Sequence, residues 1–248
     1  MVLEGKIPKM DANYLISILL SIPGVFLALA VHECAHGWMS YKLGDPTAKN
    51  LGRLTLNPVK HIDPIGLICM ILFHFGWAKP VPVNARYYKK PRRDMALVAA
   101  AGPVSNVLMS LFGMLLLHIV YFFYSLSADA LPFAALWYTA LFGTPLEMEV
   151  GGKLMYLLFV FLQQFSILNV CLAVFNLIPI PPLDGSRIAY IFLPTKVYFG
   201  LMRYERYIMI GFFVLLAFGA FNGVLDTVSM WLFNGIVSLI RLIPFFRF

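Results

Sequence analysis

The chain has 248 residues, of which 60% are hydrophobic and 12% are charged, and its mean hydropathy is +0.81. Soluble domains have about 45–50% apolar and about 25% charged residues, so this composition excludes an ordinary soluble protein. It predicts an all-α protein that crosses a lipid bilayer several times. The net charge of +7 is then evidence about membrane topology and does not indicate binding to nucleic acid.

Apolar runs and their interruptions divide the chain into about five transmembrane helices, each of which needs about 20 apolar residues. In the first part of the chain we expect a long helix at 14–41, a polar loop at 42–60 with a short strand at 51–56, and an apolar stretch at 62–78. A basic segment at 79–93, with an edge strand at 81–84, precedes a long helix at 95–125 and a loop at 126–152 with an interfacial piece near 131–142. The rest of the chain is expected to form a helix at 154–178, a Pro-rich and then amphipathic region at 179–206, and an apolar region at 207–240. The last region is expected to form either a tight pair of short helices or one long tilted helix.

The charges of the loops orient these helices. Residues 79–93 carry six basic side chains and no acidic one, whereas residues 126–152 carry three acidic side chains and no basic one. Basic loops stay on the cytoplasmic side, so 42–60, 79–93 and 182–206 are predicted inside and 126–152 outside. Because both ends of 62–78 are basic, this stretch is predicted to be a re-entrant or interfacial segment that does not span.

The motif His32-Glu33-Cys34-Ala35-His36 lies inside the first apolar run. On a helix, residues four apart share a face, so both imidazoles can bind one metal ion. Glu33 lies beside them, where a carboxylate can take a proton from a metal-bound water. Ionisable residues in a membrane span cost about 2.5–3.5 kcal/mol each on insertion scales, and a metal site accounts for three of them in five residues.

A catalytic zinc usually has three protein ligands and one open position, so a third ligand is expected at the same depth as the two histidines. Asp184 follows the helix at 154–178 where it reaches the cytoplasmic side, in the irregular segment Pro181-Pro182-Leu183-Asp184-Gly185. Spacing alone gives equal weight to Asp184 as a ligand and to Asp184 as a solvated turn residue.

Three segments in this order resemble the site-2 protease family of intramembrane zinc metalloproteases. They are H-E-C-A-H at 32–36, A-G-P-V-S-N at 101–106 and F-N-L-I-P-I-P-P-L-D-G at 175–185, and the likeness extends over roughly residues 20–190. The resemblance implies that one Zn²⁺ per chain is bound by His32, His36 and Asp184, with Glu33 as the general base.

The resemblance also implies a function and a location. We expect a single integral membrane protease domain over 1–248, with its core at about 14–190 and the helical pair or long helix at about 207–240. It would hydrolyse peptide bonds of membrane-spanning substrates, and its active site would face the cytoplasmic side of the plasma (inner) membrane. A catalytically inactive relative that binds membrane proteins and a metal-ion transporter are the alternatives.

Two further residues are candidates for substrate or oxyanion binding. Asn106 lies four residues after Gly102 at the cytoplasmic end of its helix, at the depth of the metal site. Its amide would donate either to the substrate backbone or to the oxyanion. A polar contact between helices, which the small Gly102 permits, is an equally weighted role for Asn106.

Overall fold

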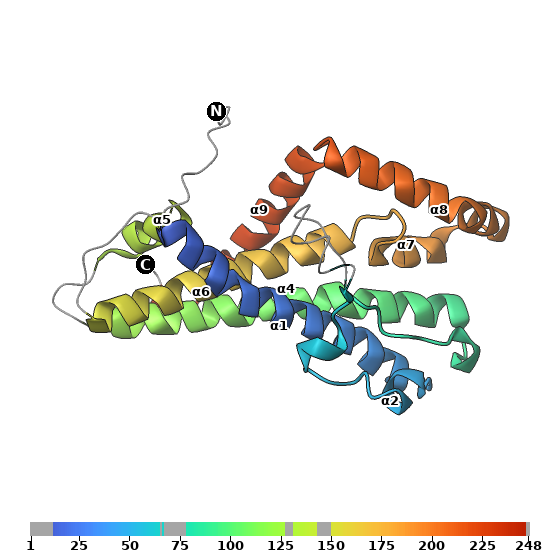
Figure 1. The fold of residues 1–248 in the computed structure, drawn as a ribbon, viewed down its shortest axis with the longest axis horizontal. Coiled ribbons are helices and arrows are strands. Elements are labelled where there is room, and N and C mark those ends of the chain that lie inside the picture. The colour runs from blue at the N-terminus through green and yellow to red at the C-terminus, as the bar shows by residue number, and fades with distance from the viewer. Residues whose placement is uncertain (1–11, 65, 67–77, 127–130, 143–149, 247–248) are drawn as a thin grey trace. The chain divides into compact units, whose positions relative to one another are not determined.

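The computed structural model describes residues 12–64, 66, 78–126, 131–142 and 150–246, which are mostly helical (Figure 1). The elements in chain order are α1 (Ala12–Lys42), α2 (Thr47–Asn50), η1 (Pro58–Lys60), η2 (Ala85–Tyr87), α4 (Pro91–Tyr124), α5 (Phe133–Phe142), α6 (Val150–Asn176), α7 (Asp184–Ala189), η3 (Tyr190–Phe192), α8 (Thr195–Ala217), α9 (Asn222–Ile240) and η4 (Pro244–Phe246). The long helices α1, α4 and α6 begin and end within a few residues of their predicted bounds.

Four of the described helices are long and apolar enough to cross a membrane. These are α1 from Leu19 to Lys42, α4, α6 from Gly152 to Asn176, and α9. About five spans were expected, and α8 does not qualify because Arg203, Glu205 and Arg206 interrupt its apolar run. Most of the predicted re-entrant segment 62–78 lies outside the described residues, so that expectation stays a prediction.

Local sequence explains where α4 begins. Pro91 occupies the first helical position, where its missing N–H costs nothing. Asp94 lies in the first turn, and its carboxylate accepts hydrogen bonds from the backbone N–H of Lys90 at 3.0 Å and from Nε of Arg93 at 2.8 Å. An acidic residue in the first turn also complements the positive end of the helix dipole.

The chain divides into two compact units, to both of which α1, α4 and α6 contribute segments. The first unit comprises residues up to Val25, Ser110–Leu168 and Gly235–Phe248. Within it, α4 and α6 approach closely at Gly113, where an added Cβ would lie 2.5 Å from Oγ of Ser166. Small residues of this kind let membrane helices pack backbone to backbone.

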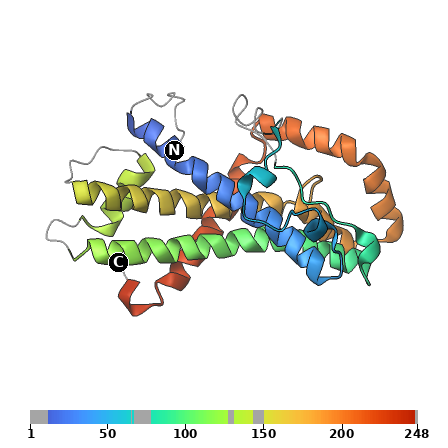
Figure 2. The same cartoon turned by 60° about the horizontal axis from the view of Figure 1, so that its bottom comes forward.

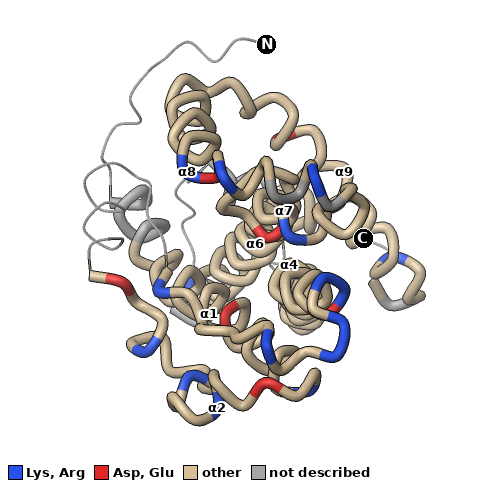
Figure 3. Tube along the Cα trace, turned by 90° about the vertical axis from the view of Figure 1, so that its right-hand side faces the viewer, with Lys and Arg blue, Asp and Glu red and all other residues tan. Residues whose placement is uncertain are grey.

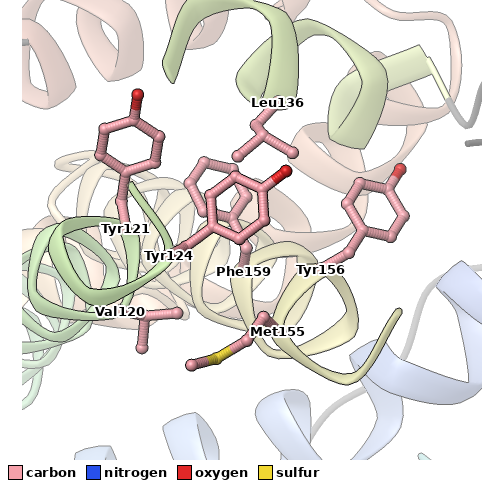
Figure 4. A pocket seen from close by; sticks show the side chains of 7 residues that line it. All are labelled: Val120, Tyr121, Tyr124, Leu136, Met155, Tyr156 and Phe159. Atoms are coloured by element: carbon pink, nitrogen blue, oxygen red, sulfur yellow. The ribbon is translucent and has the colours of Figure 1, made fainter. Parts of the chain in front are cut away.

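A small pocket in the first unit lies between α4, α5 and α6. Figure 4 shows its lining of Val120, Tyr121, Tyr124, Leu136, Met155, Tyr156 and Phe159. This lining contains no His, Cys, Asp or Glu, so it offers none of the side chains that commonly bind a catalytic metal. The helix α5 on one side of the pocket falls within the interfacial piece that was expected near 131–142.

The second unit comprises Phe26–Met109 and Asn169–Asn234, and therefore holds every candidate site residue. The region 207–240 is a helical pair: α8 ends at Ala217, the chain turns, and α9 begins at Asn222. Figures 1 and 2 both show this change of direction. Gly219 enables the turn, because its φ of +73° is a conformation that other residues rarely adopt.

The short strands expected at 51–56 and 81–84 are absent, although both segments are described. In the described part of the chain, the only β-type pairing is an isolated antiparallel bridge between Ile62 and Ala78. The backbone N–H of Val81, which a sheet would use, donates instead to a side chain of α1. A segment that has no neighbouring strand is not assigned as a strand, however extended its backbone is.

Candidate metal centre and catalytic site

The two motif histidines face each other on α1. Nε2 of His32 and Nε2 of His36 are 3.0 Å apart, and their rings meet edge to face. The helical spacing of four residues brings both rings to one face, as the sequence predicted. His32 is almost fully buried, so its ring has no bulk water to satisfy its nitrogens.

Asp184 completes a group of three. Its Oδ2 lies 3.2 Å from Nε2 of His32 and 3.3 Å from Nε2 of His36. Burial opposes ionisation of this carboxyl, but hydrogen bonds and positive charge from the imidazoles of His32 and His36, when these rings are protonated, outweigh burial and lower its pKa to about 2. Asp184 is therefore an anion at neutral pH.

A glycine places Asp184 beside α1. Gly185 is buried, and a Cβ added to it would collide with the carbonyl groups of Leu177 and Ile178 at the end of α6. Only a residue without a side chain lets α7 begin this close to α6. Gly185 thus allows the close approach of α7 to α6, and this approach places Asp184 where its carboxylate reaches the two histidines.

The other ring nitrogen of each histidine is committed to a protein acceptor. Nδ1–H of His36 donates to the carbonyl oxygen of Val98 at 2.7 Å, and Nδ1–H of His32 donates to Oδ1 of Asn106. These bonds hold the proton of each neutral ring on Nδ1 and leave a lone pair on Nε2. When both rings are neutral, as metal-binding histidines must be, two lone pairs and a carboxylate oxygen face one another.

This donor set fits a metal ion. The three ligand atoms of His32, His36 and Asp184 lie within 4.8 Å of one another. In a tetrahedral zinc site with bonds near 2.0–2.1 Å, ligand atoms are roughly 3.3 Å apart. The observed separations of 3.0, 3.2 and 3.3 Å match this value. Oδ2 of Asp184 is also buried without a hydrogen-bond partner among the described residues, a costly state that a cation would relieve.

Gly102 lets α4 pack directly against the two imidazole rings. A Cβ at this position of α4 would lie 2.5 Å from Cε1 of both rings and would collide with Nε2 of His36. The sequence suggested that Gly102 serves substrate or oxyanion binding, and the structure places it against the ligand nitrogens. Because Gly102 has no side chain, both imidazole rings can lie directly against α4.

Asn106 is fully buried and hydrogen-bonded at both ends of its amide. Its Oδ1 accepts from His32, and its Nδ2 donates to Oδ1 of Asn169 at 2.8 Å. Of the two roles considered for Asn106, this arrangement favours the contact between helices over donation to an oxyanion. It adds a function to that contact, because the amide holds the ring of a ligand histidine.

Glu33 is held by the backbone of a distant segment. Its Oε2 accepts a hydrogen bond from the N–H of Val81 at 2.8 Å. No sequence pattern identified this donor, because a main-chain group leaves no trace in the residue type. Asn169 had a weak signal in the sequence, as a polar residue within the apolar run at 154–178.

His61 makes a local hydrogen bond. Its Nε2–H donates to the carbonyl oxygen of Thr55 at 2.8 Å, and it does not belong to the metal-binding group. His74 lies outside the described residues.

Comparison with known proteins places the chain in a family. The model of peptidase family M50 matches residues 21–219. YwhC of Bacillus subtilis (strain 168), whose name designates it a candidate zinc metalloprotease, is 40% identical over 77% of this chain and 77% of its own length. Rip2 of Mycolicibacterium smegmatis, named in the same way, is 28% identical over 70% of this chain and 57% of its own length. Rip2 of Mycobacterium tuberculosis (strain H37Rv) is 27% identical over 86% of this chain and 72% of its own length. No solved structure matches the chain.

Proposed function

The chain belongs to peptidase family M50 and is an intramembrane zinc metalloprotease, and from this premise we propose that His32, His36 and Asp184 bind one zinc ion per chain while Glu33 is the general base. The observation that carries the assignment is the convergence of three candidate ligand atoms at separations of 3.0–3.3 Å, with Nδ1 of each ring hydrogen-bonded to a protein acceptor. With neutral rings, such a group is unfavourable without a cation at its centre.

The residues divide the chemistry among them. A zinc ion bound here would supply Lewis acidity, which polarises a carbonyl and acidifies water. Glu33 takes a proton from the attacking water as the new C–O bond forms, and it delivers that proton to the amine nitrogen as the C–N bond breaks. Val98 and Asn106 keep the ligand lone pairs of His36 and His32 directed at the site.

The substrate is proposed to be a membrane-spanning protein or peptide that is cut on the cytoplasmic side of the plasma (inner) membrane. Lysine and arginine residues are concentrated around α2 and at the start of α4, within the unit that contains the site (Figure 3). Basic segments remain cytoplasmic, so water would reach the ligands from that face. Neither a metal-ion transporter nor an inactive relative is favoured, because the base and the three ligands are all present.

The test uses the full chain purified in detergent, with zinc measured by elemental mass spectrometry and cleavage measured on a panel of single-span substrates. Glu33→Gln removes the base and no ligand. It should keep one zinc per chain and the wild-type melting temperature while cleavage falls by roughly 10²–10⁴-fold. Substantial cleavage by Glu33→Gln would overturn the role assigned to Glu33.

A further inference from the structure

The contact between Glu33 and Val81 belongs to a segment that has few backbone hydrogen-bond donors. Residues 79–84, which we term the strap, read Lys-Pro-Val-Pro-Val-Asn. Pro80 and Pro82 have no N–H, so Val81 supplies the only backbone donor between Lys79 and Val83. That single donor is directed at Oε2 of Glu33 at 2.8 Å. The orientation of the Glu33 carboxylate therefore depends on the position of the Val81 backbone.

Packing holds the middle of the strap against α1. The side chain of Val81 is buried, and a Cβ added to Gly37, one helical turn after Glu33, would lie 3.1 Å from Cγ1 of Val81. The same Cβ would lie 2.7 Å from Cδ2 of Leu54, so Gly37 provides the room in which the strap crosses the helix.

Both ends of the strap are tied by charged side chains. At its start, Nη2 of the buried Arg53 donates to the carbonyl oxygen of Lys79 at 2.7 Å. At its end, the N–H of Asn84 donates to Oδ2 of Asp45 at 2.7 Å. Hydrogen bonds to ionised groups are about twice as strong as neutral ones, so these two ties fix the strap better than a backbone contact would.

Asp45 is the centre of the second tie. It is fully buried, and besides Asn84 its carboxylate accepts from Oγ of Ser40 at 2.8 Å, from the N–H of Thr47 at 2.9 Å and from Oγ1 of Thr47. Burial opposes its ionisation, but these donors outweigh burial and lower the pKa of Asp45. The ionised carboxylate thus joins the end of α1, through Ser40, to the end of the strap.

We propose that Asp45 is a positioning residue for the proteolytic reaction: it holds the strap so that the Val81 amide aims the carboxylate of Glu33 at the reacting water. This inference rests on the proposed role of Glu33. Asp45 lies twelve residues after the base, belongs to no part of the metal-binding group and acts only through Ser40, Asn84 and Val81.

The structure provides a matched control. Asp94 is also buried and also binds one backbone N–H and side-chain donors, but its partners are Lys90 and Arg93 at the start of α4 and not the strap. Asp94→Asn therefore removes the same chemical group without loosening the contact to Glu33. A second pair of variants distinguishes the role of the Val81 backbone amide from that of its side chain. Val81→Pro removes the N–H, whereas Val81→Ala keeps it.

The first measurement is steady-state cleavage with zinc content. Asp45→Asn should lower kcat by roughly 10²-fold, because a displacement near 1 Å of a catalytic group costs that much, with KM and zinc per chain unchanged. Asp94→Asn should keep kcat within about twofold of the wild type, and Val81→Pro should lose far more than Val81→Ala. Unchanged kcat in Asp45→Asn, or a loss that follows lost zinc, would overturn the proposal.

The second measurement does not need activity. Because Pro80 and Pro82 have no N–H, the amide of Val81 is the only exchangeable backbone amide in residues 80–82, and its exchange can be followed by hydrogen-exchange mass spectrometry of peptides over this segment from protein in detergent. The amide should exchange slowly in the wild type and faster in Glu33→Ala and in Asp45→Asn, with no change in Asp94→Asn. Equal exchange in wild type and Asp45→Asn would refute the positioning role. If Glu33→Gln proves active while Asp45→Asn still accelerates this exchange, the role of Glu33 as base fails and the mechanical link stands.

Discussion

The substitution Gly102→Ala, which adds one methyl group, should disturb the proposed metal site without disrupting the fold. The new Cβ would lie 2.5 Å from Cε1 of His32, whereas ordinary contacts begin at 3.4 Å, so the ring must move by about 0.9 Å. The ring of His36 is approached at least as closely. Both Nδ1 atoms are hydrogen-bonded to fixed acceptors, so neither ring can retreat without breaking such a bond.

The expected result for Gly102→Ala is a loss of zinc together with a loss of cleavage. A 1 Å misplacement of catalytic groups costs roughly 10²-fold in rate, and we expect zinc affinity to fall in the range of 10–100-fold known for disturbed ligand shells. Zinc affinity is measured by competition with a chelator, and cleavage is measured on a single-span substrate at saturating zinc.

Gly211→Ala is the matched control for this experiment. Gly211 lies in α8, and nothing is within 4 Å of a Cβ added there. Alanine has a higher helix propensity than glycine by about 1 kcal/mol, so this variant should be neutral or slightly stabilised. If Gly102→Ala binds zinc and cleaves like the wild type, the rings are not confined as the structure describes and the assigned role of Gly102 is refuted.

Four further outcomes are expected. Asp184→Ala should lower zinc occupancy as well as activity, since two imidazoles alone bind weakly, and full zinc in this variant would remove Asp184 from the ligand set. Asn169→Leu should weaken zinc binding by roughly 10-fold, because Asn106 loses the acceptor that fixes its amide. Gln163 is a buried amide in the same helix that donates to Trp137, and Gln163→Leu should leave zinc binding unchanged. Because the pKa of Asp45 is lower in the folded protein, its carboxylate stabilises the fold fully above the unfolded-state pKa near 4, and this stabilisation is lost as the pH falls below that value. The melting temperature of Asp45→Asn should therefore lie below that of the wild type at pH 7 and approach it toward pH 3. Tyr88, which also contacts Ser40, stays protonated over this range. Cysteines at Lys49 and Lys90, in a background without the native three, should be labelled from the same membrane face by an impermeant reagent, and labelling from opposite faces would show that 62–78 spans.

The local sequence was sufficient for the helices and for bringing together two of the proposed ligands. Long apolar runs determine membrane helices because each span must satisfy its own backbone in lipid, and α1, α4 and α6 follow those runs. His32 and His36 converge for a reason equally local, since four residues make about one helical turn. Two helices joined by a turn were one of the two forms expected for 207–240, and Gly219, with its φ of +73°, lies in that turn, although the first helix, α8, begins earlier at Thr195.

Contacts between residues distant in sequence decided the rest of the site. Asp184 lies about 150 residues from the histidines, and sequence spacing could not distinguish a ligand from a solvated turn; the close approach of Gly185 to the end of α6 brings it within 3.3 Å of both rings. The strand-like segment 81–84 shows the opposite case, because its pattern suits an edge strand but its only donor near the site is taken by Glu33. Side-chain periodicity is encoded along the chain, whereas the partner of a backbone N–H or of a buried amide depends on which segments meet. For that reason the sequence alone indicated the membrane helices and the candidate metal-binding motif, and only the tertiary structure showed the contacts by which Asn106, Val81 and Asp45 would hold the proposed site in place.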